Sequence, residues 1–78
     1  MDVLKRINEI TEGRGIVRNL RVTQINGNVV NGQYSGVICT FDSEGNKIPL
    51  EVFVFPDGKK DKCVYVKAET IACIEVID

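Results

Sequence analysis

The chain has 78 residues, the size of one domain, and 44% of them are apolar, which excludes the composition of a disordered protein. Its formal net charge of −1 excludes the strongly basic balance typical of nucleic-acid-binding domains, so any such binding has to use a local patch. The longest apolar run, Val52 to Phe55, is far too short to cross a bilayer, and we expect a cytoplasmic protein with no membrane partner.

A helix is predicted first, over about residues 2–12. Its apolar residues follow the i, i+3, i+4, i+7 spacing of an amphipathic helix: Val3, Leu4, Ile7 and Ile10. Asp2 is suited to cap its start, and Gly13 is suited to end it. Because so short a helix is unstable alone in water, we expect its apolar stripe to cover one open end of a barrel.

Five strands are predicted next, over about residues 16–25, 29–41, 48–55, 62–67 and 72–77. Each is rich in β-branched and aromatic residues, and Asn, Asp and Gly mark the hairpin turns between them. The break before Ile71 has no glycine and is predicted to be a single helical turn. The expected fold of residues 1–78 is one mainly β domain, an N-terminal helix followed by a strongly bent, antiparallel open barrel.

Glycines inside the second strand are expected where it bends, at Gly32 and Gly36. Crowding and strain at such a bend predict that Gly36→Val destabilises the fold by about 1–3 kcal/mol.

Alternation in the third strand predicts that both of its faces are apolar. One face carries Ile48, Leu50, Val52 and Val54, and the other carries Glu51, Phe53 and Phe55, so both faces are apolar near the end of the strand. Strands that are apolar on both faces lie under the helix or meet another subunit. A chain this short also has a small core, so the pattern predicts a homo-oligomer.

Two segments resemble the motifs of the Sm-like family of small barrels, which are also SH3-like in shape. They are Asn26-Gly27-Asn28-Val29-Val30-Asn31-Gly32-Gln33-Tyr34-Ser35-Gly36 and the apolar spacing of residues 64–76. The resemblance implies a ring in which the fourth strand of one subunit pairs with the fifth of the next. It also implies RNA contacts through an Asp and Asn after the second strand and an Arg-Gly pair at the start of the last turn.

This chain departs from the family pattern at both RNA-contacting positions. The family Asp falls on Ile38, and the Arg-Gly pair is Lys67-Ala68. Asp42 and Asn46 either imitate the Asp and Asn pair or form an ordinary turn. These departures weaken the implied RNA recognition and leave the implied self-association intact.

Basic residues are the candidate contacts to nucleic acid. If the helix lies beside the first strand, one cationic face combines Lys5, Arg6, Arg14, Arg18 and Arg21, with Lys67 as a separate candidate. The alternative is that these are separate solvated charges, since acidic residues lie among them.

Residues that carry catalysis or bind cofactors are scarce. The chain has no His, and Cys39, Cys63 and Cys73 lie in strand-like contexts without metal-ligand spacing, so we expect reduced, buried thiols. No catalytic site, metal or cofactor is expected. The preferred function is a non-enzymatic, self-associating interaction or adaptor module that binds itself, or a protein partner, through edge strands or apolar outer faces. The alternative is an Sm-like RNA-binding protein that uses the basic face.

Overall fold

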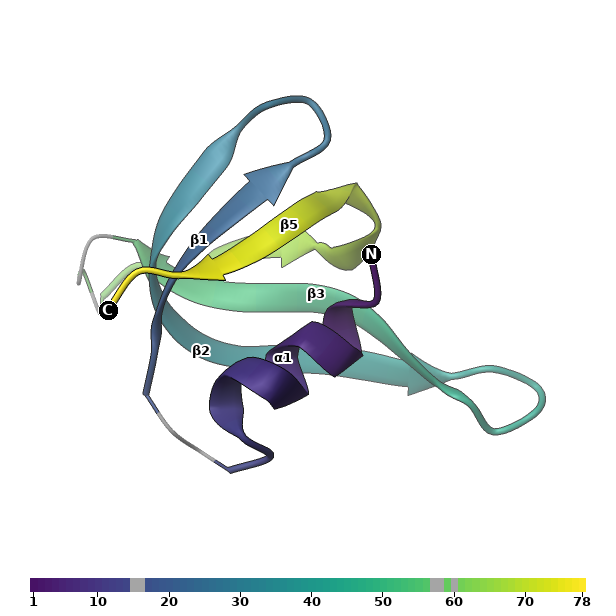
Figure 1. Cartoon of the computed structure of the whole chain (residues 1–78). Coiled ribbons are helices and arrows are strands. Elements are labelled where there is room, and N and C mark those ends of the chain that lie inside the picture. The colour runs from purple at the N-terminus through teal and green to yellow at the C-terminus, as the bar shows by residue number, and fades with distance from the viewer. Residues whose placement is uncertain (15–16, 57–58, 60) are drawn as a thin grey trace.

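A computed structural model describes residues 1–14, 17–56, 59 and 61–78 of the chain (Figure 1). The elements in order are α1 (Val3–Thr11), β1 (Asn19–Gln24), β2 (Val29–Phe41), β3 (Lys47–Pro56), β4 (Val64–Lys67), the 3-10 turn η1 (Ala68–Thr70) and β5 (Ile71–Val76). The mainly β class, the N-terminal helix, the five strands and the helical turn before the last strand are confirmed. The predicted start of the first strand, at residue 16, lies outside the described residues.

The strands form one open antiparallel sheet in the order β4-β3-β2-β1-β5, so β4 and β5 are its two edges. β2 pairs with β1 along its first part and with β3 along the rest, and Gly32 lies where the two pairings overlap. A Cβ atom at Gly32 would lie 2.7 Å from the carbonyl carbon of Phe55, whereas one at Gly36 would meet no described atom within 4 Å. The crowding predicted at Gly36 is therefore found at Gly32 instead.

The hydrophobic core lies between α1 and one face of the sheet, called the inner face below. The helix begins at its N-cap Asp2, whose carboxylate accepts the Lys5 N–H, and ends at Glu12 in the left-handed conformation. α1 contacts β3 and β5, so its apolar stripe packs on a face of the open sheet rather than on the open end of a barrel. The buried apolar residues are Val3, Ile7, Ile10, Leu20, Val22, Val52, Val54, Val66, Ala68, Ile71 and Ile74.

A β-bulge interrupts the alternation of β3. Ile38 pairs with Glu51, but the next residue of β2, Cys39, pairs with Pro49, so Leu50 is an extra residue in β3. Val52 and Val54 are fully buried, while Leu50 is 46% exposed. The prediction that Ile48, Leu50, Val52 and Val54 share one face is therefore wrong, because the extra residue ends the two-residue period.

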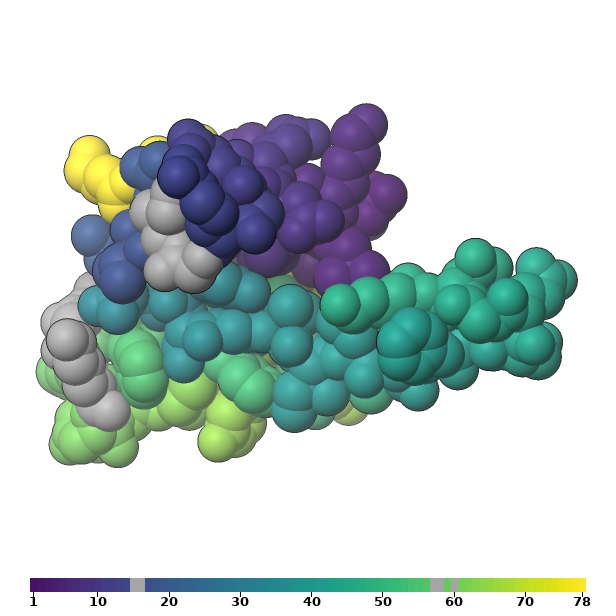
Figure 2. Space-filling model, turned by 90° about the horizontal axis from the view of Figure 1, so that it is seen from below, coloured from purple at the N-terminus to yellow at the C-terminus, as the bar shows by residue number. Residues whose placement is uncertain are grey.

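The far end of the β2 and β3 hairpin, residues 38–50, projects from the body of the molecule and is called the arm below (Figure 2). It carries large apolar side chains that are exposed: Ile38, Phe41, Ile48 and Leu50. Such a cluster on an extended hairpin is typical of a surface that meets another molecule.

Candidate functional site

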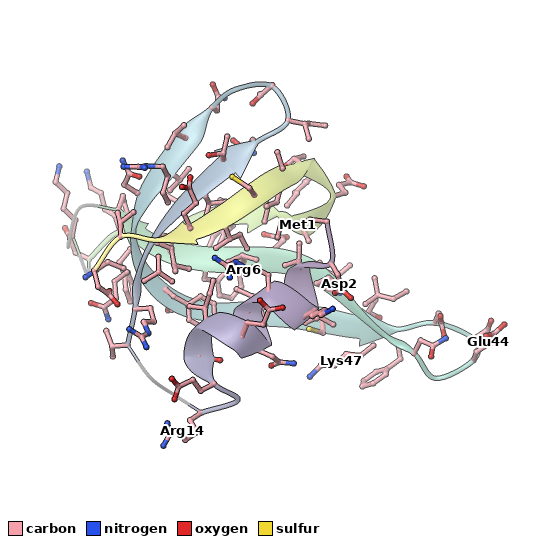
Figure 3. All side chains as sticks on the ribbon, in the orientation of Figure 1. Met1, Asp2, Arg6, Arg14, Glu44 and Lys47 are labelled. Atoms are coloured by element: carbon pink, nitrogen blue, oxygen red, sulfur yellow. The ribbon has the colours of Figure 1, made fainter. Side chains whose placement is uncertain are left out.

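Arg6 of the predicted cationic face reaches from α1 to the edge strand β5 (Figure 3). Its Nε donates a hydrogen bond of 2.8 Å to the main-chain carbonyl of Ile74, and its guanidinium lies 3.5 Å from the Glu9 carboxylate. Through these two contacts the Arg6 side chain links the helix to the sheet. It is therefore unsuited to bind a phosphate without loss of these contacts.

Arg18 joins three parts of the fold. Its guanidinium donates to the Asp78 carboxylate at 2.8 Å and to the carbonyl of Ile10, at the end of α1, at 3.3 Å. The main-chain N–H of Asn19 donates to the other Asp78 oxygen at 2.7 Å. This N–H first, and then Arg18, hold the pKa of the Asp78 carboxyl below its usual range. Arg18 and Asp78 thus form an ion pair that ties the helix end to the last residues.

The remaining basic candidates do not gather beside these two. Arg14 pairs with the neighbouring Glu12 carboxylate at the exposed end of the helix. Arg21 lies opposite Glu75 in the pairing of β1 with β5, and Lys67 lies opposite Glu51 at the other side of the sheet. Lys5 is exposed on α1. The structure therefore places acidic groups beside most of the predicted contacts, as the alternative of separate solvated charges requires.

Asp42 and Asn46 form the turn at the tip of the arm, near Glu44 (Figure 3). The Asp42 carboxylate accepts the main-chain N–H of Asn46 and that of Glu44, both at 2.9 Å, and the Asn46 side-chain amide at 3.2 Å. The N–H of Asn46, with these other bonds, keeps the pKa of Asp42 below its usual value. Both side chains are thus used by the turn, which favours the ordinary turn over an imitated RNA site.

A groove between α1 and β2, with both polar and apolar side chains along it, was not predicted from the sequence. It has a volume of about 360 Å³ and contains Asn8, Arg14, Tyr34 and Lys47 among its lining residues. Burial raises the pKa of the Tyr34 hydroxyl, which stays protonated at neutral pH. Residues far apart in the sequence meet here, so no local motif marks the groove.

An apolar patch covers the outer face of the sheet where β2, β3 and β4 pair. The patch surrounds a shallow hollow of about 460 Å³, which Glu51 also lines. Its apolar residues, called the outer patch below, are Ile38, Phe53, Phe55, Cys63 and Tyr65. The Phe53 and Tyr65 rings meet edge to face with centroids 4.8 Å apart, and Tyr65 is 62% exposed. The patch continues to the edge strand β4, so side chains and main chain together offer an interaction surface.

Metal-ligating side chains and thiols are the remaining candidate chemical groups of the chain. No group of metal-ligating side chains is present among those residues. Cys39, Cys63 and Cys73 are free and only half-buried, so the prediction of buried thiols is partly wrong. Their partial exposure follows from positions on the arm, before β4 and on an edge strand. Across the described ranges, no helix has the length and apolar character of a membrane span.

Comparison of the chain with known proteins found no matching family model, curated protein or solved structure. The resemblance to the Sm-like family thus stays a prediction, and the function has to be argued from the surfaces described above.

Proposed function

We propose that the protein is a non-enzymatic, self-associating small-barrel module, which serves as an oligomeric interaction or adaptor unit. The observation that carries the proposal is the outer patch beside an unpaired edge of the sheet. Main-chain groups at an open edge readily pair with another strand, and an adjacent apolar surface adds the burial that makes such pairing stable. A domain of this size gains stability by burying more surface in an oligomer.

Self-association is expected to be visible in solution at tens of micromolar protein. Size-exclusion chromatography with light scattering should give a mass above that of the 8.7 kDa chain, and dilution should lower it. Tyr65→Ser, which removes an exposed ring at the edge, should weaken association, whereas Val29→Ser, at an exposed apolar residue that begins β2, should leave it unchanged. A monomer at the highest concentration would contradict the proposal.

Single-stranded RNA is expected to bind no more tightly than micromolar near physiological salt. The acidic partners of Arg6, Arg14 and Arg18 would compete with phosphates, so few cations are left for an RNA strand. Fluorescence anisotropy with mixed RNA and DNA at several salt concentrations measures this. About four phosphate contacts would produce a logarithmic salt slope of roughly −3. Submicromolar binding that Lys5→Glu and Arg21→Glu abolish would instead favour the RNA-binding alternative.

A further inference from the structure

The two edge strands of the sheet, β4 and β5, differ in whether their outward main-chain groups are free to pair with another strand. The Ile77 N–H donates to the Asn19 carbonyl at 2.9 Å, which puts Asn19 and Ile77 at a bonded position of the β1 and β5 ladder, although the Asn19 N–H itself bonds the Asp78 carboxylate. Bonded and non-bonded pairs alternate along antiparallel strands. Ile74, three positions earlier, belongs to a non-bonded pair, and its main-chain groups point away from β1 to the outer edge.

Arg6 occupies that outward edge. Its Nε bonds the Ile74 carbonyl at 2.8 Å, in the middle of the six-residue strand β5. A strand added to this edge would lie about 4.8 Å from β5 and would need to bond the Ile74 carbonyl. The Arg6 guanidinium already bonds that carbonyl and occupies the position of the added strand. The helix that carries Arg6 is fixed by the buried side chains of Val3 and Ile7. Pairing at β5 would therefore require loss of a charge-assisted hydrogen bond and movement of a packed helix.

At the opposite edge, β4, no side chain of the described residues blocks the middle of the strand in this way. Among the described residues, the only side-chain bond to the β4 main chain comes from the Thr70 hydroxyl to the carbonyl of Lys67, at its last residue. Tyr65 stands beside this edge and joins it to the outer patch. The chain thus offers one open edge, with an aromatic surface next to it, and one edge closed by Arg6.

We propose that two copies of this chain pair through β4 in an antiparallel, two-fold arrangement, and that Arg6 limits the assembly to two by closing β5. This rests on the proposed self-association and names its edge and partner. When each copy has a single open edge, the two like edges meet and the assembly is closed. Pairing of β4 with β5 of the next copy would instead continue from copy to copy and build either the ring that the Sm-like resemblance implies or an open filament.

Charge at the two ends of β4 supports the antiparallel direction. Asp61 precedes the strand and Lys67 ends it. With Tyr65 opposite Tyr65 of the second copy, Lys67 comes opposite Cys63 of that copy, and Asp61 lies two residues before Cys63, in the turn that leads into β4. Opposite charges at neighbouring positions across a strand pair attract. The two-fold axis repeats the favourable contact at both ends of the interface.

Matched lysine variants at the two edges test which one is used. Tyr65→Lys places like charges together across the axis and should give a folded monomer, whereas Ala72→Lys, at an exposed residue of β5, should leave the dimer intact. Light scattering reports the mass, and circular dichroism reports the fold. If the unmodified protein is monomeric, both the self-association and this edge assignment are wrong. If it associates but Ala72→Lys disrupts it as strongly as Tyr65→Lys, only the edge assignment is overturned.

Exchange of the charges at Asp61 and Lys67 tests the β4 interface even if Tyr65→Lys does not fold. Asp61→Lys and Lys67→Asp should each raise the dimer dissociation constant roughly fivefold, and the double variant should restore it. Failure of the double variant to recover any affinity would overturn the antiparallel arrangement.

The role of Arg6 is tested by its removal. Arg6→Ala should open β5 and produce species larger than a dimer, while Lys5→Ala, its exposed neighbour on α1, should remain a dimer. An Arg6→Ala protein that keeps its helix content and stays dimeric would overturn the proposed guard.

Discussion

Gly32→Ala is expected to destabilise the protein by about 3 kcal/mol or more, because the new methyl group would enter the main chain of β3. Its Cβ would lie 2.7 Å from the carbonyl carbon of Phe55 and 2.9 Å from the Cα of Pro56. Main chain cannot rotate away as a flexible side chain can. β2 and β3 must therefore separate at the point where β2 also pairs with β1, and the damage reaches three strands.

Gly36→Ala is the matched control for this prediction. It makes the same chemical change in the same strand, but its Cβ would meet open space among the described residues. Urea denaturation, followed by circular dichroism at one low protein concentration, measures both variants free of changes in association. We expect the Gly36 variant within about 1 kcal/mol of the parent. Equal losses at the two positions would show that the close approach at Gly32 is not the cause.

Leu20→Ala is expected to cost about 2–5 kcal/mol of the free energy of unfolding. The Leu20 side chain is fully buried in β1, and its paired neighbours are Gly32 in β2 and Val76 in β5. Because the β2 residue directly opposite Leu20 is a glycine, it has no side chain that could fill the cavity. Since small domains have a total stability of about 5–15 kcal/mol, this one change should leave much of the protein unfolded in mild urea.

Leu50→Ala removes the same atoms from a site that is 46% exposed. Leu50 is the extra residue of the β3 bulge, so its side chain leaves no closed cavity. We expect a loss below about 1 kcal/mol, and urea midpoints of the two variants give the comparison. A Leu50 variant as unstable as the Leu20 variant would mean that the arm is packed in solution, and would argue for a partner on it.

The sequence predicted which residues are candidates for the site, but not how they are arranged in space. Exposed apolar side chains were foreseen from the two apolar faces of the third strand, and Phe53 and Phe55 do belong to the outer patch. Arg6 was identified as a candidate contact for phosphate, yet its partner Ile74 is 68 residues away in the chain. No local sequence pattern encodes the contact between Arg6 and Ile74, because the position of α1 over the sheet determines it.

By itself the sequence determined the element types and most of their limits, since helix caps, turn residues and strand propensity act over a few neighbouring residues. β2 has its predicted bounds, Val29–Phe41, and α1 is capped by Asp2 as expected. Only the tertiary structure decided which side chains are buried beyond the β3 bulge, because one extra residue exchanges the faces of a strand. It also decided that Arg18 pairs with Asp78 and that Gly32, rather than Gly36, is crowded. These outcomes depend on distances between segments that are remote in the sequence. A local sequence pattern contains no information on such distances.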